Sequence, residues 1–170
     1  MSSTDSPLLI LGIDPGSNAT GYGVIAMQRQ RLQAIDYGVI RPPKGNLGSR
    51  LRAIYEGVAE LIERHQPVEV GIERAFVHVN PASALALGQA RGAALAAAMS
   101  RPCEYAEYAP RAVKLALVGS GKADKIQVAH MVRHILKLAG PIAEDAGDAL
   151  AIAVCHAHSR GLGARLSVRA

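Results

Sequence analysis

The chain has 170 residues, a length that suits one domain with a single hydrophobic core. Hydrophobic residues make up 49% of it and charged residues 19%, so the composition is globular and excludes an intrinsically disordered chain. The net charge of +5 is compatible with binding a polyanion, although many basic proteins bind no nucleic acid. Two cysteines without CxxC spacing argue against a disulfide framework and against a zinc site.

The sequence pattern predicts a cytoplasmic protein with short tails. The first residues lack a basic region followed by an apolar run, and polar residues interrupt the longest uncharged stretch, 75–90. We therefore expect neither a secretory signal nor a membrane span. Residues 1–7 form a predicted flexible tail, 8–158 a single domain, and 159–170 a basic C-terminal tail that includes Arg160.

Apolar runs, helical spacing and turn residues predict strands that alternate with helices. In chain order the predicted elements are strands at 8–13, 21–27 and 32–40, a helix at 49–65, a strand at 68–73, a helix at 82–100, a strand at 103–108, and helices at 111–117, 123–138 and 144–158. This order is typical of an α/β domain with a mixed sheet covered by helices.

The predicted helix at 82–100 is unusually rich in small residues. Arg91 is its only charged residue, which indicates that most of the helix is buried. Small side chains recur every fourth position, at Ala84, Gly88, Gly92 and Ala96. Such a face lets another backbone come close, so it either packs on the sheet of the same chain or contacts a second subunit. The sequence favours neither reading over the other.

Acidic residues follow two of the predicted strands. Asp14 ends the first strand and Glu73 ends another, and in open α/β sheets such strand ends line the functional crevice. Asp145 and Asp148 lie three apart in the first turn of the last helix, so their side chains share one face. We expect these acids to converge on one site.

Carboxylates that converge would repel one another without a positive partner. An all-oxygen set suits Mg²⁺ or Mn²⁺. Two such ions, about 3.5–4 Å apart, can activate a water molecule on one side of a phosphate and stabilise the leaving oxygen on the other. Each acid also has a plainer reading: an Asx turn for Asp14, an exposed strand end for Glu73, and favourable helix-dipole charges for Asp145 and Asp148.

The Asp14-Pro15-Gly16 turn admits a different class of protein. Asp followed by Gly after a buried strand also occurs in the phosphate-binding loops of actin-like ATPases and sugar kinases. Those folds need a second large lobe, for which 170 residues leave no room, and the sequence contains no GxxxxGK[ST] loop. The length therefore argues against a nucleotide hydrolase.

Five short motifs in order, spread over 8–158, resemble the RuvC family of Holliday-junction resolvases. One motif alone would be weak, whereas five in the right order and spacing are specific. The matching residues are Gly12-Ile13-Asp14-Pro15-Gly16-Ser17 with Thr20-Gly21-Tyr22-Gly23-Val24-Ile25, Ile72-Glu73 with Phe76 and Asn80, Ser83-Ala84-Leu85 with Leu87 to Gly92, Val113-Lys114 with Lys125 and His130 to Arg133, and Asp145 to Ala153.

The resemblance implies an RNase H-like fold with a five-stranded mixed sheet covered by helices. It implies a homodimer that makes two symmetric, metal-dependent nicks in four-way junction DNA, with RuvA and RuvB as partners in recombination and repair. It assigns Asp14, Glu73, Asp145 and Asp148 as the catalytic and metal-binding residues. The implied cofactor is Mg²⁺, two ions in each active site, with Mn²⁺ as a substitute.

Three further residues are expected to contact DNA by the same resemblance. Lys114 and Lys125 match basic residues near the active site, whereas Lys122 has only its proximity in sequence. A lone aromatic in a loop is usually a core residue, but the family match predicts that Phe76 stacks on an unpaired base. Arg74 fits either a DNA contact or a pair with a neighbouring acid.

Other functional classes remain open at this point. A non-catalytic junction-binding scaffold could share the fold, although the intact set of four acids argues against it. A nuclease that cuts RNA–DNA hybrids could also share it, and only the matches at Phe76, Lys114 and Lys125 favour a junction.

Overall fold

The computed structural model describes residues 6–74 and 80–166, and for 161–166 it gives only the backbone. Five strands and five helices lie in these residues. The strands are β1 (Leu8–Asp14), β2 (Thr20–Gln28), β3 (Arg31–Ile40), β4 (Glu69–Glu73) and β5 (Glu104–Tyr108). The helices are α1 (Leu47–His65), α2 (Pro81–Ala98), α3 (Pro110–Val118), α4 (Lys125–Leu136) and α5 (Glu144–Leu166).

The strands form one mixed sheet in the order β3-β2-β1-β4-β5. β1, β2 and β3 pair antiparallel, while β4 runs parallel to β1 and β5 runs parallel to β4. β1 therefore lies at the centre of the sheet, and the carboxyl ends of β1 and β4 meet at one edge. The predicted α/β fold with a five-stranded mixed sheet is confirmed.

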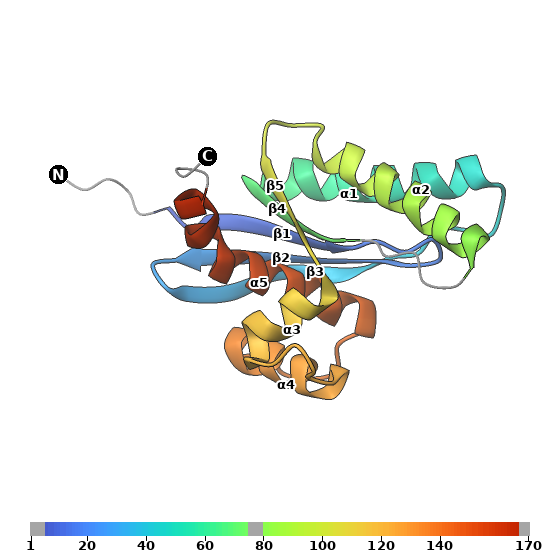
Figure 1. The fold of residues 1–170 in the computed structure, drawn as a ribbon. Coiled ribbons are helices and arrows are strands. Elements are labelled where there is room, and N and C mark those ends of the chain that lie inside the picture. Colours follow the sequence, from blue (N-terminus) through green and yellow to red (C-terminus); the bar gives the residue numbers. More distant parts are fainter. Residues whose placement is uncertain (1–5, 75–79, 167–170) are drawn as a thin grey trace.

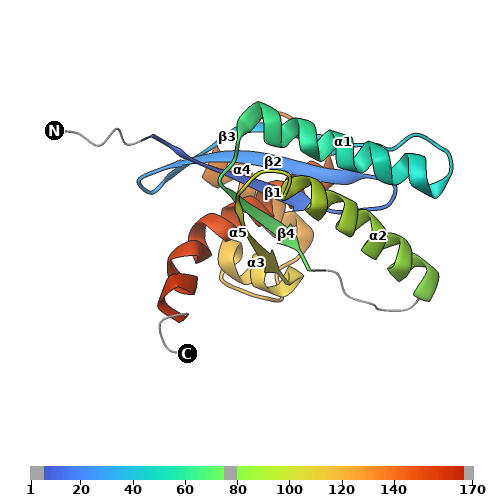
Figure 2. The ribbon, with the colours of Figure 1, turned by 90° about the horizontal axis from the view of Figure 1, so that it is seen from above.

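Helices cover both faces of the sheet, as Figures 1 and 2 show. α1 and α2 lie side by side on one face, and α5 crosses the other with α3 and α4 packed outside it. Each face has its own apolar core, built from aliphatic side chains and alanines with few aromatics. α5 contributes to one core the unbroken buried run from Ala149 to Ala157.

α5 lies unusually close to the sheet because glycines face it. A Cβ on Gly12 of β1 would overlap the carbonyl oxygen of Ala149, and one on Gly21 of β2 would overlap that of Asp145. These glycines allow the helix backbone to rest directly on β1 and β2. The position of α5, and of the two aspartates at its start, is thereby fixed against the strands.

Several helix boundaries differ from the predictions by one or two residues, and the end of α5 differs by more. Two of these differences have a clear physical cause or consequence. α5 continues to Leu166 although its end was predicted near 158, and the side chain of Arg160 binds Glu69 of β4. α4 begins at Lys125, not 123, because Asp124 is its N-cap and forms a capping box with Gln127. The apolar periodicity alone could not locate this cap.

α2 presents two faces of small residues, and only one of them is buried. Ala90, Ala94, Ala97 and Ala98 pack in the core beside α1, whereas Gly88 and Gly92 are exposed, with no other side chain or strand within 4 Å of a Cβ built on either. The fourfold small-residue row therefore does not pack on the sheet, at least within the described residues. None of the helices in 6–74 and 80–166 is both long and apolar enough to cross a membrane.

Candidate active site

Two of the predicted acids lie side by side at one edge of the sheet. Asp14 is the last residue of β1 and Glu73 the last of β4. The parallel register pairs Ile13 with Ile72, so the two following residues are neighbours. Their carboxyl groups are close enough that the pKa of Asp14 is raised by burial and then by the charge of Glu73.

The other two acids come from the start of α5 and complete a single pocket. Asp145 and Asp148 lie in the first two turns, where the close approach of Asp145 to Gly21 holds the helix over the strand ends. The convergence expected from the strand-end pattern is present in the structure. The pocket encloses about 400 Å³ and is lined by Asp14, Glu73, Pro110, Val113, Lys114, Lys125, Val128, Glu144, Asp145, Asp148, Ala151 and Ile152.

Burial and mutual repulsion make these carboxyls hard to ionise together. Burial, with further contributions from Glu73, Asp148 and Asp145, raises the pKa of Asp14 from its ordinary 3.8 to about 8. Burial is also the main reason that the pKa values of Glu73 and Asp148 are raised. A cation in the pocket would therefore stabilise the ionised form of these carboxylates.

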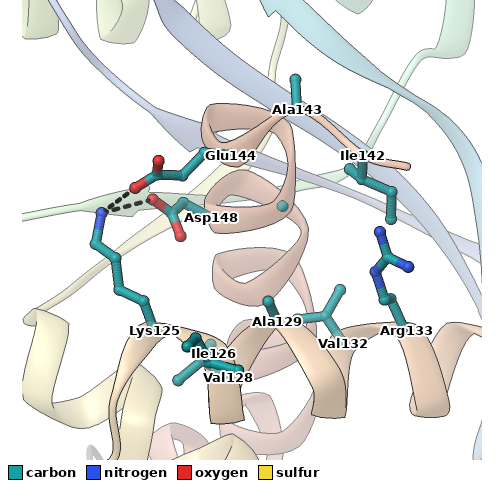
Figure 3. A pocket seen from close by; sticks show the side chains of 11 residues that line it. Lys125, Ile126, Val128, Ala129, Val132, Arg133, Ile142, Ala143, Glu144 and Asp148 are labelled. Atoms are coloured by element: carbon teal, nitrogen blue, oxygen red, sulfur yellow. Dashed lines mark hydrogen bonds and ion pairs between the residues drawn. The ribbon is translucent and has the colours of Figure 1, made fainter.

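Two lysines supply positive charge at the rim. Lys125, the first residue of α4, lies 2.5 Å from a carboxylate oxygen of Glu144 and 3.7 Å from one of Asp148, as Figure 3 shows. Lys114 reaches the same pocket from α3 and is half-buried. Lys122 is exposed and does not line the pocket. This agrees with the sequence analysis, in which only its proximity to the other lysines suggested a DNA contact.

A second, mainly apolar pocket adjoins the acidic one. It encloses about 340 Å³ between α4 and the start of α5, and it shares Lys125, Glu144 and Asp148 with the acidic pocket. Ala129, Val132 and Ile142 form its apolar wall, and Arg133 lies at its far end (Figure 3). Lys125 and its two acids thus separate the acidic pocket from an apolar one.

The donor chemistry of the acidic pocket fits a hard divalent cation. All four acids offer carboxylate oxygens, which Mg²⁺ and Mn²⁺ prefer. In the part of the chain that is described, no three Asp, Glu, His or Cys side chains are grouped closely enough to ligate one ion as they stand. Ligation would therefore require the side chains to turn inward.

The turn after Asp14 is held in place by two sets of contacts. Thr20 donates its hydroxyl to the carbonyl of Gly16 at 3.0 Å. Arg50 from α1 donates to the carbonyl of Ser17 and to the side-chain oxygen of Asn18, the latter at 2.8 Å. The rim of the pocket beside Asp14 is thus tied to both β2 and α1.

Sequence reasoning missed one residue that contacts the site. Arg91 of α2 donates from Nε to the main-chain oxygen of Glu73 at 3.1 Å. The signal available was its status as the only charge in an apolar helix, and it was interpreted only as a sign of burial. Arg74 has its Nε 3.8 Å from Glu107, so it lies by a neighbouring acid. Phe76 falls outside the described residues.

The comparisons with known proteins agree with this arrangement. The family model described as "Crossover junction endodeoxyribonuclease RuvC" matches residues 10–156. A RuvC of Pseudomonas putida (strain W619) is 53% identical over 152 residues, which are 89% of this chain and 87% of the relative.

Solved structures of RuvC from Thermus thermophilus match in fold as well. One has a TM-score of 0.83 and 35% identity, and the match covers 92% of this chain and 97% of that one. Another, in complex with a Holliday junction substrate, has a TM-score of 0.82 and 34% identity, with 92% and 96% covered. With its sequence, fold and acidic pocket all in agreement, the chain belongs to the RuvC family of crossover junction endodeoxyribonucleases.

Proposed function

We propose that this chain is a structure-selective endonuclease that resolves four-way DNA junctions by hydrolysing two phosphodiester bonds. The observation that carries the proposal is the acidic pocket: four carboxylates from β1, β4 and α5 lie beside two lysines in a chain of the RuvC family. Relatives of this chain are named crossover junction endodeoxyribonucleases, and one solved structure shows the RuvC of Thermus thermophilus in complex with a Holliday junction substrate. Recombination and DNA repair are the processes that such an enzyme serves.

We propose Mg²⁺ as the cofactor, two ions in each site, with Mn²⁺ as a substitute. Asp14, Glu73, Asp145 and Asp148 would hold the ions, because their half-buried carboxyls line one pocket and offer only oxygen ligands. When bound, the ions would supply an activated water molecule and stabilise the leaving oxygen. The protein itself holds the acids at fixed places on the sheet and on α5.

Lys114 and Lys125 would contact the phosphates next to the scissile bond. Both line the pocket that contains the acids, and ammonium groups there attract a phosphate and stabilise the charge that develops on it. Lys125 is already held by Glu144 and Asp148, so it points at the acidic pocket before DNA arrives. Phe76, three residues after Glu73, would stack on an unpaired base at the junction centre.

A homodimer belongs to the same proposal. A junction has approximate two-fold symmetry and one active site makes one nick, so two nicks call for two sites related by a two-fold axis. The outward face of α2 supports this assembly. Gly88, Gly92 and Ala96 are exposed there, and Leu85 on the same helix has 65% of its surface exposed. A face without charges, built of small residues, fits a second copy of itself.

The enzyme would act in the cytoplasm, together with proteins that move the junction along DNA. RuvA and RuvB, the branch-migration proteins implied by the family resemblance, would deliver the junction. The cytoplasm is the compartment in which bacterial chromosomal DNA is found, and the matched relatives are bacterial proteins.

The direct test compares a labelled four-way junction with a linear duplex of the same sequence, each with Mg²⁺ and with EDTA. We expect paired, symmetric nicks in the junction alone, and only with Mg²⁺. Tight junction binding without cutting, across several junction sequences and with Mn²⁺ as well, would instead favour a non-catalytic scaffold. Failure to bind either DNA would contradict the proposed substrate.

A further inference from the structure

Arg91 is a largely buried charge on an otherwise uncharged helix. It is the one charged residue of α2, and only 18% of its side chain is exposed. Burying a guanidinium is unfavourable unless specific partners replace the water that it loses. The partners of Arg91 therefore indicate why the helix carries it.

Those partners lie on the two strands at the edge of the sheet nearest the site. Nε donates to the main-chain oxygen of Glu73 at 3.1 Å. Nη2 lies 2.9 Å from a carboxylate oxygen of Glu107 on β5, yet it makes no hydrogen bond of good geometry with the described residues. The contact with Glu107 is thus a charge attraction, and the directed bond of Arg91 is the one to Glu73.

The bond falls where the strand ends and is paired on one side only. β4 has five residues, its pairing with β1 ends at Ile72, and only β5 still pairs with its last residue, Glu73, through Tyr108. A short strand frays at its end unless something holds the backbone. The next residue, Arg74, is held on the β5 side by its main-chain bond to Tyr108 at 2.8 Å, and Arg91 holds Glu73 from α2.

We propose that Arg91 is a positioning residue that fixes the main chain of Glu73 so that its carboxylate faces Asp14 and can share a cation with it. Residues that orient metal ligands in this way commonly change metal affinity or activity by about 10- to 100-fold when they are replaced. The inference rests on the proposed function, because it assigns the cation to the same acids. It also means that α2 carries both a residue that contacts the active site and the proposed dimer face.

The test uses the full chain with Arg91→Met, Arg91→Lys and a matched control, Arg101→Met. Methionine keeps much of the length and the helix propensity of arginine but removes both contacts. Lysine keeps the charge near Glu107 and loses the Nε donor. Arg101 is exposed and pairs with Glu63, away from the pocket, so its replacement controls for the loss of one arginine.

Four properties would be measured for each protein. They are Mn²⁺ affinity by calorimetry without DNA, the Mg²⁺ concentration for half-maximal junction cleavage, junction affinity in EDTA, and the dimer fraction by sedimentation. For Arg91→Met we expect the first two to worsen together by about 10- to 100-fold. Junction affinity and dimer fraction should stay within about twofold, Arg91→Lys should be intermediate in metal affinity, and Arg101→Met should match wild type.

Two outcomes would overturn the proposal. One is an Arg91→Met protein that binds Mn²⁺ as tightly as wild type. The other is an Arg91→Lys protein with the wild-type melting temperature and wild-type Mn²⁺ affinity. Cation binding would then not need the hydrogen bond from Nε of Arg91 to the main chain of Glu73. Should the wild type itself neither bind Mn²⁺ nor cut a junction, the proposed function fails first, and the two failures are thereby distinguished.

Discussion

β4 carries two glutamates with opposite surroundings. Glu69, at its start, accepts hydrogen bonds from Arg160 and, at 2.7 Å, from Nε2 of His156 if that nitrogen carries the proton. Those bonds, that of Arg160 first, lower the pKa of Glu69. Glu73, four residues later, has a raised pKa, chiefly through burial. The strand thus holds one carboxylate that is paired with two positive side chains and one for which the attraction of Lys125 does not offset burial.

α5 contributes side chains that lie near both glutamates of β4. His156 binds Glu69 at one end of the helix, Ile152 packs against Gly71 in the middle, and Asp148 lies near Glu73 at the other end. Three residues of α5 that are four positions apart thus face every second residue of β4. The pairs are Asp148 with Glu73, Ile152 with Gly71, and His156 with Glu69. The paired end fixes the helix on the sheet, and the unpaired end holds the acids that await a cation.

The largest expected effect comes from the unpaired end. Replacing Asp14 with Asn should lower the single-turnover rate of junction cleavage by roughly 1000-fold or more, because a metal ligand is lost from the pocket. Junction affinity should change little, since the lysines remain. Asp36→Asn, on β3 outside the pocket, is the matched control. A wild-type rate in Asp14→Asn would show that these acids do not form the active site.

The paired end should respond in stability and not in chemistry. Glu69→Gln leaves the buried His156 and the more exposed Arg160 without their anion, so the free energy of unfolding in urea should fall by about 2 kcal/mol. Cleavage well below the melting temperature should remain near that of wild type. Glu63→Gln, an exposed acid paired with Arg101, should change neither property. A large loss of rate without loss of stability in Glu69→Gln would contradict the division of roles.

The two ends should also give opposite responses to pH. The pKa of Asp14 is raised to about 8, so without metal the folded state keeps a proton that the unfolded state releases, and stability falls as pH rises from about 4 to 8. The pKa of Glu69 is lowered, so its contribution is lost as pH falls through that lowered value.

Melting curves in EDTA at several pH values would measure this. We expect Asp14→Asn to flatten the decline toward pH 8, and Mg²⁺ to raise the melting temperature of the wild type but not of the variant. An unchanged slope in Asp14→Asn would mean that another group causes the decline.

The smallest effect is expected at the rim. Glu144 and Lys125 are both highly exposed, with 70% and 71% of their side chains accessible, so their ion pair contributes little. Glu144→Gln should change the cleavage rate by less than about threefold, because Asp148 still attracts Lys125. Lys125→Gln, which removes the ammonium itself, provides the contrast and should reduce the rate more.

Much of the candidate site was predictable because it follows local rules. Buried strands that end on acids gave Asp14 and Glu73, and a three-residue spacing in a helix gave Asp145 and Asp148. The contacts of Arg91 and Arg160 could not be predicted in this way, since each joins residues far apart in sequence, 18 positions for Arg91 and Glu73 and 91 for Arg160 and Glu69. Gly161 and Gly163 also made a helix end near 158 the natural expectation.

The most direct test of the division between the two ends is a calorimetric titration of Mn²⁺ into the wild type, Asp14→Asn and Glu69→Gln. We expect binding to the wild type and to Glu69→Gln with similar affinity, and loss of binding in Asp14→Asn. Equal binding to all three proteins, or loss of binding only in Glu69→Gln, would contradict this division of roles. The cation would then not depend on the acids at the ends of β1 and β4 and at the start of α5.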